Sequence, residues 1–300
     1  MTTMQQFERA GDSLLVRAPA KLNLSLLIAG KRADGFHELE TIMAKIDWHD
    51  ELLIGPAEGT GIELSCRGPE WAPQDQSNLV YRAAREILDK TGIRPNVRLQ
   101  LVKNIPAGTG LGSASSDAAA ALMGLNRYLD LHLPRSDLLT MASRLGSDVA
   151  FFLGGPLALC TGKGEKIRQL AGSLDFRALV IVPNVTISTK KVYENYTHDQ
   201  ALYERWARDI AGHIRENRID LVAEMCANML ERTCFKLFEE LGELKETVAS
   251  LGVRPVCLSG SGSAMFHIAD QHDVGCLEMM RDQIAENPGC RSLVVENNPW

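Results

Sequence analysis

The order of hydrophobic and polar positions in the first hundred residues predicts mainly strands. Residues 97–101 alternate valine or leucine with polar side chains, which is the period-two pattern of a strand with one buried face. Longer apolar-rich stretches precede it, and a charged turn containing Asp34-Gly35 separates the first two, as in a hairpin. The strands predicted in this part of the chain lie at residues 13–28, 39–54, 62–66 and 97–101.

Other stretches repeat apolar residues at helical spacing. In the helix predicted from Ala118, Leu122, Leu125 and Leu129 fall on one side, and four consecutive alanines favour the helical state. Strands that are concentrated early, with helices mixed in and no regular strand–helix alternation, predict an α+β fold. The remaining predicted helices lie at residues 78–90, 134–146, 219–238 and 243–251, and the remaining strands at 157–161, 178–183, 255–258 and 264–268.

The length of the chain indicates more than one domain. Three hundred residues exceed what one hydrophobic core usually serves, so we expect two domains. The glycines on either side of Lys163 mark the seam between them. The predicted domains are therefore residues 1–161 and 162–300.

A loop rich in glycine and serine follows the strand at 97–101. Pro106 ends that strand because proline lacks a backbone donor, and the glycines permit positive φ and the close approach of a ligand. The serines are candidate N-caps for the next helix, and Asp117 suits its first turn. The free N–H groups of a helix N-terminus bind phosphate. The candidate phosphate loop comprises Pro106, Ala107, Gly108, Thr109, Gly110, Leu111, Gly112, Ser113, Ala114, Ser115 and Ser116.

This loop differs from the two best-known phosphate-binding motifs. A dinucleotide fingerprint requires glycine where the chain has Ser113, and a P-loop requires a lysine, which is absent between Pro106 and Asp117. A tight turn capped by serine is an alternative interpretation of the same residues. The loop alone therefore indicates phosphate binding without naming the ligand.

Lys21 and Asp148 are the candidate catalytic residues. Lys21 interrupts an apolar strand, with Asn23 on the same face, and a buried lysine is costly unless it meets a partner or an anionic ligand. The alternative is a surface lysine on an edge strand. Asp148 precedes an apolar run, where a carboxylate can cap a helix or act as a base. A kinase that acts on an alcohol uses an aspartate near the hydroxyl and a cation near the developing charge.

Two further segments have both a functional and a plain interpretation. Phe36-His37, in the turn after the first strand, can stack on and hydrogen-bond a flat ring, although a loop histidine is commonly just solvated. The stretch 259–263 reads Ser-Gly-Ser-Gly-Ser and is either a flexible hairpin or a surface that closes on substrate across the domain cleft. Histidine and cysteine show no metal-ligand spacing, so we expect no protein-held metal site.

Composition narrows the partners and the location. The hydrophobic share of 45% and the charged share of 23% are ordinary for a globular protein, and the net charge of −6 argues against nucleic-acid binding through a basic surface. Seven dispersed cysteines without a C-x-x-C pair predict reduced thiols, with Cys160 and Cys257 in the core. We expect a cytoplasmic protein that is a monomer or a homodimer. A signal peptide and a membrane helix are not expected, because residues 1–12 are polar and no long apolar run follows.

Taken in order, these motifs resemble the GHMP kinase superfamily, which includes galactokinase, homoserine kinase and mevalonate kinase. That superfamily combines a Pro-x-Lys-x-Asn strand, a central Pro-x-Gly-x-Gly-Leu-Gly-Ser loop and a late Ser-Gly-Ser-Gly loop, all of which occur here. Within it, the chain is most similar to a kinase of the non-mevalonate isoprenoid pathway. The resemblance implies a two-domain fold with the active site in the cleft. The motifs specific to that branch lie at residues 18–24, 32–39, 146–152, 161–165 and 183–185.

The resemblance also implies a reaction. The γ-phosphoryl group of ATP would be transferred to the 2-hydroxyl of 4-diphosphocytidyl-2-C-methyl-D-erythritol. Asp148 would be the base or the group that orients the hydroxyl, and Lys21 would hold it ionised and offset charge at the reacting oxygen. Lys103 and residues 106–116 would bind ATP, while Mg²⁺ is expected on the phosphates with few protein ligands.

The second substrate, which carries a cytidine diphosphate group, is assigned by the same resemblance. Asn23 would position the erythritol, His37 would read the cytosine, and Phe36 and Tyr193 would form aromatic walls. The family usually has tyrosine in place of Phe36 and a richer glycine run than the one at 110–116. The alternatives are another GHMP kinase, acting on homoserine, mevalonate or a sugar, a catalytically silent relative that senses a metabolite, and a non-kinase nucleotide-binding module.

Overall fold

The computed structural model describes residues 5–170, 175–269, 274–287 and 289–300. The strands are β1 (Phe7–Ala10), β2 (Ser13–Lys31), β3 (His37–Pro56), β4 (Ile62–Arg67), β5 (Val97–Val102), β6 (Leu157–Gly162), β7 (Lys166–Gln169), β8 (Arg177–Pro183), β9 (Cys257–Leu258), β10 (Met265–Ala269) and β11 (Cys290–Glu296). The helices are α1 (Leu79–Thr91), α2 (Ser113–Tyr128), α3 (Arg135–Leu145), α4 (Val149–Phe152), α5 (Thr189–Glu194), α6 (Gln200–Arg215), α7 (Ile219–Glu224), α8 (Glu231–Leu237), α9 (Glu239–Ser250) and α10 (Val274–Ala285).

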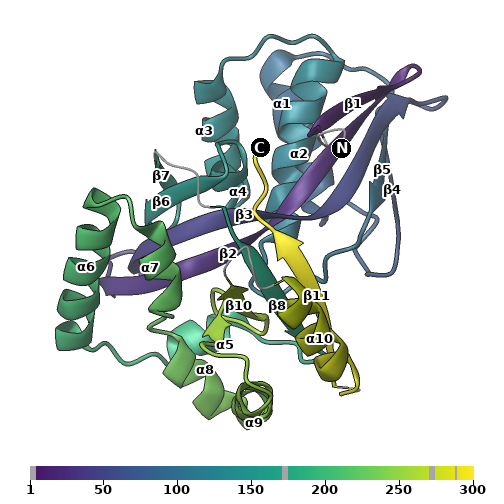
Figure 1. Cartoon of the computed structure of the whole chain (residues 1–300). Coiled ribbons are helices and arrows are strands. Elements are labelled where there is room, and N and C mark those ends of the chain that lie inside the picture. The colour runs from purple at the N-terminus through teal and green to yellow at the C-terminus, as the bar shows by residue number, and fades with distance from the viewer. Residues whose placement is uncertain (1–4, 171–174, 270–273, 288) are drawn as a thin grey trace.

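These elements form two sheets with helices packed around them (Figure 1). The larger sheet has seven strands, ordered β1-β2-β3-β5-β4, with β6 paired to β3 and β7 paired to β6. The smaller sheet has four strands, ordered β11-β8-β10-β9. The pairing is antiparallel except between β4 and β5, and the mixture of sheets and helices confirms the predicted α+β class.

The long strands β2 and β3 run through the centre of the molecule (Figure 1). They pair antiparallel along most of their lengths, with three register shifts, one of them between Asn23 and Ser25. The turn between them contains Gly35, whose φ of 84° lies in the left-handed region that favours glycine, so the predicted hairpin is confirmed. Since β3 also pairs with β5 and β6, it connects the whole larger sheet.

Helix α2 packs closely on the larger sheet because its facing side chains are small. The four alanines at 118–121 are all buried, and Gly124 lies against the side chains of Val16 and Ile54. Helices α1 and α3 pack against α2 in turn. This arrangement places the start of α2, and the glycine loop that leads into it, next to β2.

The second half of the chain shares its core with the middle of β2 and β3. Leu22 and Ile42 from these strands belong to the same buried cluster as Val180 and Phe266 from the smaller sheet. The two sheets are therefore not independent units, because the central hairpin packs against both halves. The predicted boundary at residue 162 stays a prediction, and β7, which follows it, lies in the larger sheet.

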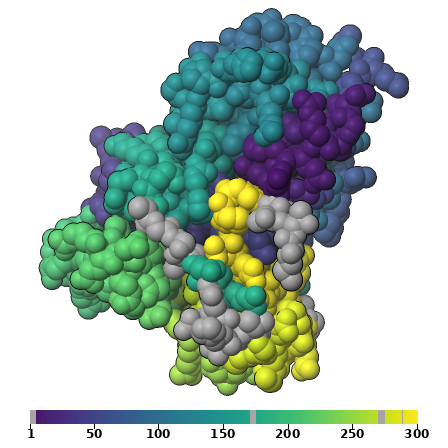
Figure 2. All heavy atoms as spheres, turned by 45° about the horizontal axis from the view of Figure 1, so that its top comes forward, coloured from purple at the N-terminus to yellow at the C-terminus, as the bar shows by residue number. Residues whose placement is uncertain are grey.

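The C-terminal segment returns to the larger sheet. Asn297 forms an isolated bridge with Ile46, and the backbone N–H of Asn298 donates to the carbonyl of Lys45 over 3.0 Å. Figure 2 shows this segment in yellow, close to the purple N-terminal strands. The last described residues thus pack against the strand at the centre of the fold.

The single helix predicted over residues 219–238 is wrong. Its two ends are helical, as α7 and α8, but the backbone between them leaves the helix to pair with β2. Leu26 N–H donates to the carbonyl of Ala227 over 2.7 Å, and Met229 N–H donates to the carbonyl of Leu26 over 2.9 Å. A continuous helix would use these backbone groups internally, so the pairing with β2 breaks it.

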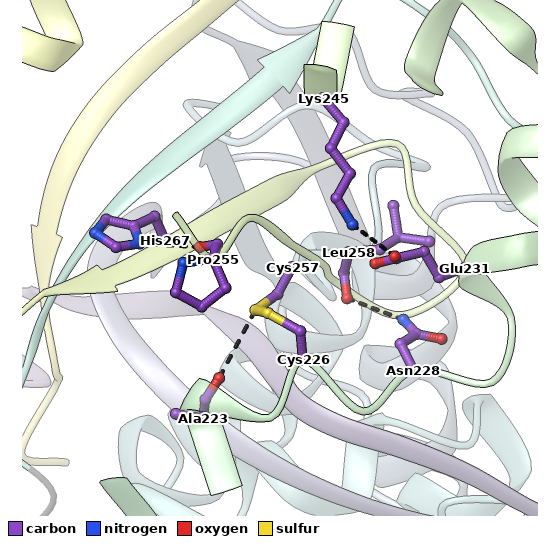
Figure 3. Close-up of a disulfide and its surroundings, with 9 residues drawn as sticks. All are labelled: Ala223, Cys226, Asn228, Glu231, Lys245, Pro255, Cys257, Leu258 and His267. Atoms are coloured by element: carbon purple, nitrogen blue, oxygen red, sulfur yellow. Dashed lines mark hydrogen bonds and ion pairs between the residues drawn. A yellow bond between two sulfur atoms is a disulfide. The ribbon is translucent and has the colours of Figure 1, made fainter. Parts of the chain in front are cut away.

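A disulfide joins this break to β9 (Figure 3). It links Cys226 to Cys257, whose Cα atoms are 4.9 Å apart. The expectation of reduced thiols is wrong for this pair, because the break in the helix brings Cys226 beside β9. The other cysteines among the described residues are free, and Cys160 is buried in the core as predicted.

Several elements have no counterpart in the sequence prediction, namely β1, β7, α4, α5, α6, α10 and β11. Helix α6 was missed although Trp206, Ile210 and Ile214 recur along it at helical spacing and make it amphipathic. Within the described part of the chain, no helix is both long and apolar enough to cross a membrane.

We expect Gly124→Ala to destabilise the fold, because a Cβ there would lie 2.5 Å from Cδ1 of Ile54 and 2.8 Å from Cγ2 of Val16. Overpacking of this kind costs about 1–3 kcal/mol. Gly212→Ala in α6 is the matched control, since a Cβ there meets nothing within 4 Å and the helix gains roughly 0.5–1 kcal/mol. Urea unfolding of both variants measures the difference; a Gly124→Ala protein as stable as Gly212→Ala would contradict the close packing of α2.

Candidate active site

A cavity of about 820 Å³ is lined by residues from both halves of the chain. Its walls come from β2 and the turn after it, the glycine loop, the segments around Asp148 and Lys163, and α5. The structure therefore brings together candidate residues that are far apart in sequence. The predicted site residues that line the cavity are Lys21, Asn23, Phe36, His37, Gly110, Gly112, Asp148 and Tyr193.

Lys21 is almost completely buried at one end of this cavity, with 3% of its side chain exposed. Its ammonium donates to Oδ1 of Asn23 and, over 2.6 Å, to the carbonyl of Gly110. Oδ2 of Asp148 lies 3.9 Å from the same nitrogen. Burial lowers the pKa of Lys21, and the negative charge of Asp148 acts against that shift. The alternative of a surface lysine on an edge strand is excluded.

Asn23 is oriented by a side chain on the neighbouring strand. Its Nδ2 donates to Oγ1 of Thr41 over 2.8 Å, and Thr41 in turn donates to the carbonyl of Ser25 over 2.6 Å. Because the amide nitrogen is held on this side, the amide oxygen points to Lys21. The register shift after Asn23 lies at this same place in the β2–β3 pair.

Asp148 lies at the N-terminal end of α4, but its side chain makes no capping hydrogen bond. With 32% of its side chain exposed, it faces the cavity opposite Lys21. Gly164 lies close to it, since a Cβ on that glycine would be 3.6 Å from Oδ1 of Asp148. The carboxylate is therefore available to a ligand and is not used to cap α4.

The glycine loop has three residues with positive φ, at Gly108, Gly110 and Gly112. Gly110 cannot be replaced without moving the backbone, because a Cβ there would lie 2.1 Å from the carbonyl oxygen of Ser259. Ser259 also donates its hydroxyl to the carbonyl of Gly110 over 3.0 Å. The segment 259–263 therefore connects the paired strands β9 and β10 and packs against the glycine loop, while its closing on substrate stays a prediction.

Gly112 occupies the N-cap position of α2, with φ of 73°, and no side chain caps the helix. The prediction of a serine cap is therefore wrong, as is the placing of Asp117 in the first turn, since α2 already begins at Ser113. The hydroxyl of Ser113 is instead bound inside the protein, to Lys103 and Asp50. Without a capping side chain, the N-terminus of α2 keeps N–H groups for a ligand.

Lys103 lies beneath this helix start and not in the cavity. Its ammonium contacts Asp50 and Ser113 and donates to Oδ2 of Asp117 over 2.8 Å. Burial and the neighbouring Asp50 raise the pKa of Asp117 to about 8, although Lys103 acts in the opposite direction. The two acids and the lysine form a buried network that holds the loop from below.

Aromatic side chains gather at the other end of the cavity. The ring of His37 lies 5.3 Å from Tyr193 and 5.8 Å from Tyr196, between centroids. Phe36 is 56% exposed, and the ammonium of Lys163 lies 4.7 Å from the centre of its ring. Burial lowers the pKa of His37, which favours the neutral imidazole. This end of the cavity can accept a flat, polar ring.

Comparison with known proteins identifies the family. Residues 78–156 match the GHMP kinases N terminal domain, and residues 210–275 match the GHMP kinases C terminal domain. The chain is 40% identical over 259 residues to 4-diphosphocytidyl-2-C-methyl-D-erythritol kinase of Prosthecochloris aestuarii, with 85% of this chain and 88% of that protein covered. This chain belongs to that family of GHMP kinases. The enzyme of the same name from Clostridium botulinum is 32% identical over 273 residues, covering 90% of this chain and 97% of that one.

Solved structures of GHMP kinases share this fold. A crystal structure of 4-(cytidine 5'-diphospho)-2C-methyl-D-erythritol kinase has a TM-score of 0.74 at 32% identity, covering 95% of this chain and 100% of that chain. Homoserine kinase from Cytophaga hutchinsonii has a TM-score of 0.76 at 19% identity, covering 99% and 98%, and so supports the fold alone. The resemblance to GHMP kinases and the two-domain α+β fold are confirmed.

In the part of the chain that the structure describes, the acidic, histidine and cysteine side chains of this GHMP kinase do not form a metal cage. No group of three or more of them is placed to hold a metal ion among the residues that the structure describes. Ser116 in the first turn of α2 has a buried hydroxyl without a hydrogen-bond partner. An oxygen donor of this kind suits Mg²⁺, which commonly keeps only one or two protein ligands beside phosphate oxygens.

Several residues of the GHMP kinase site were missed by the sequence analysis. Thr41 orients Asn23, and Tyr196 and Lys163 extend the aromatic end of the cavity. Asn228 donates to the carbonyl of Leu258 over 2.9 Å (Figure 3). It also donates to the carbonyl of Gly260 over 2.8 Å and so fixes the segment around Ser259. Thr41 and Asn228 are single polar residues among buried neighbours, and that is the signal that could have identified them.

We expect Asp117→Asn to remove a pH dependence of stability. The pKa of Asp117 is raised to about 8 in the folded protein from its ordinary value of 3.8. The folded state therefore binds more protons between these values, and the wild type loses stability as the pH rises through that range. Asparagine does not ionise, so the free energy of unfolding of the variant should fall less.

Urea unfolding of both proteins near pH 5 and near pH 8 provides the measurement. Asp12→Asn, at an exposed position in the β1–β2 turn, is the control and should follow the wild type. If Asp117→Asn loses as much stability as the wild type over this range, the raised pKa of Asp117 is wrong.

Proposed function

We propose that this chain transfers the γ-phosphoryl group of ATP to the 2-hydroxyl of 4-diphosphocytidyl-2-C-methyl-D-erythritol. The observation that carries the proposal is one cavity with Lys21 and Asp148 at one end, the aromatic groups around His37 at the other, and the glycine loop between the halves of the protein. The relatives of this chain, at 32% and 40% identity over most of its length, carry the name of that activity. One end of the cavity can bind a nucleobase, and the other end holds the groups for phosphoryl transfer. This combination suits the cytidyl substrate better than homoserine, mevalonate or a simple sugar.

Asp148 and Lys21 carry the chemistry in this proposal. The hydroxyl proton moves to a carboxylate oxygen of Asp148 while the substrate oxygen forms its bond to the γ-phosphorus. The bond from that phosphorus to the bridging oxygen breaks, and ADP leaves. The ammonium of Lys21, fixed by Asn23 and Gly110, offsets negative charge at the reacting oxygen.

The nucleotide is assigned to the glycine loop and the start of α2. Backbone N–H groups of residues 106–116 would surround the triphosphate, since no side chain caps the helix. Lys103 would contribute to ATP binding indirectly, by holding the glycine loop in place, because its ammonium is bound to Asp50 and Asp117 below the loop. Mg²⁺ bound to the phosphates, with Ser116 as a candidate protein ligand, would reduce their charge.

The second substrate is assigned to the remaining lining of the cavity. Asn23 would position the erythritol beside Asp148. His37 would hydrogen-bond the cytosine, with Phe36 and Tyr193 against its faces. We place this reaction in the cytoplasm, where ATP is available, and expect a monomer or a homodimer.

An ADP-release assay against four acceptors tests the function. We expect turnover with 4-diphosphocytidyl-2-C-methyl-D-erythritol and none with homoserine, mevalonate or galactose. Asp148→Ala should abolish transfer, because the hydroxyl loses its proton acceptor, while ATP affinity stays within about twofold. Turnover of another acceptor would assign the chain to a different GHMP activity, no turnover at all would support a silent metabolite sensor, and full activity in Asp148→Ala would refute the mechanism.

The cytidyl end of the cavity has its own test. We expect His37→Ala to weaken affinity for the cytidyl substrate at least about tenfold, the cost of one lost hydrogen bond to a buried base, and to change ATP affinity little. Calorimetric titration with each ligand measures both affinities. His213→Ala on α6, outside the cavity lining, is the control. Equal losses for both ligands would show that His37 does not read the base.

A further inference from the structure

Lys45 on β3 is a second buried lysine, and no step of the proposed reaction uses it. Its side chain is 1% exposed, and its ammonium has no carboxylate partner within the described part of the chain. It lies directly opposite Lys21 in the β2–β3 register. Directly opposed residues point to the same face of a sheet, so Lys45 approaches the catalytic region from beside Lys21.

The ammonium of Lys45 is bound to the end of α4. It donates to the carbonyl of Gly154 over 2.8 Å and to that of Phe152 over 3.3 Å, and it lies 5.9 Å from the centre of the Phe151 ring. Carbonyls at the end of a helix lack partners inside it and carry partial negative charge. The Lys45 ammonium gives these carbonyls a hydrogen-bond donor, and its positive charge offsets their partial negative charge.

Helix α4 needs such a contact because it has only four residues. Helices of this length are not stable alone, and their position is set by tertiary contacts. Asp148 lies at the opposite end of α4. Its carboxylate makes no capping bond, so the placement of the helix decides the distance from Asp148 to Lys21.

A side-chain contact supports the same connection. A Cβ on Gly112 would lie 2.9 Å from Cζ of Phe152 and 3.0 Å from Cγ of Lys21. The ring of Phe152 therefore packs beside both the phosphate loop and the catalytic lysine. A shift of α4 would move this ring together with Asp148.

We propose that Lys45 is a positioning residue: its ammonium binds the carbonyls of Phe152, the last residue of α4, and of Gly154 just after it, fixes that helix, and so holds Asp148 in place for phosphoryl transfer. The inference rests on the proposed function, since it takes Asp148 as the group that meets the hydroxyl. A displacement of about 1 Å at a reacting group can cost on the order of 100-fold in rate. Loss of the contact should therefore affect turnover far more than nucleotide binding.

The charge of Lys45 responds to pH near neutrality. Burial lowers the pKa of Lys45 to about 7, and the nearby positive charge of Arg135 at the start of α3 contributes. Other titratable groups on the elements around Lys45 include Lys21 on β2, Asp148 before α4 and Cys160 on β6. A charged donor binds a carbonyl about twice as strongly as a neutral one, so the hold on α4 weakens as the pH rises through about 7.

Lys45→Met and Lys45→Gln test the proposal, with Lys166→Met on the exposed strand β7 as the matched control. Methionine keeps the length and fills the buried space without a donor. We expect kcat to fall on the order of 10- to 100-fold in Lys45→Met, with KM for ATP within about twofold of wild type. Lys45→Gln, which retains one donor group, should lose less. Melting temperatures of all variants should stay close to that of the wild type.

The profile of kcat against pH separates positioning from a purely structural role. We expect the wild type and Lys166→Met to lose kcat as the pH rises through about 7, and Lys45→Met to lack that decline. Identical profiles in the wild type and Lys45→Met, or a Lys45→Met kcat within about twofold of wild type, would overturn the proposal. If Lys45→Met does not fold, the kcat and profile of Lys45→Gln decide by the same criteria. A wild type without turnover on the cytidyl substrate would refute the proposed function instead.

Discussion

The ammonium of Lys21 is the group on which the geometry of this site depends. A buried cation must be surrounded by acceptors, and here these come from three separate parts of the chain. Asn23 follows on the same strand, Gly110 belongs to the glycine loop, and Asp148 precedes α4. The strand, the loop and the segment before α4 all also line the cavity. The need to satisfy one charge therefore fixes the strand, the loop and the carboxylate relative to one another.

The contact between the two glycine-rich segments applies a second constraint to the same loop. Gly110 and Ser259 approach so closely that no side chain fits between them. The hydroxyl of Ser259 donates to the carbonyl of Gly110, and the backbone N–H of Ala264 donates to the carbonyl of Thr109. One segment leads into α2 and the other follows β9, so the phosphate loop is held by both halves of the protein. From below, the charged network around Lys103 holds the start of α2. Small residues in both segments are thus required by packing as well as by a phosphate ligand.

The sequence was sufficient to predict the features that rest on local patterns. The early strands, the Asp34-Gly35 hairpin and α1 follow from alternation, turn residues and helical spacing. Lys21 and Asp148 were found because each is a charge beside apolar neighbours. The break between α7 and α8 could not be predicted, since it arises from pairing with β2, some two hundred residues earlier. Lys45 shows the same signal, a charge between Ala44 and Ile46, and was missed; its acceptors are backbone carbonyls, so the sequence does not indicate what it binds.

The return of the C-terminal segment to β3 bears on how the enzyme is made. Asn298 binds the backbone of Ile46, a residue 252 positions earlier, beside the strand position of Lys45. A ribosome delivers that partner only after 252 further residues have been synthesised. The nascent first half can form its sheet, yet the central strand lacks this support until Asn298 has been made. Assembly of the catalytic region is in this way coupled to synthesis of a segment far along the chain.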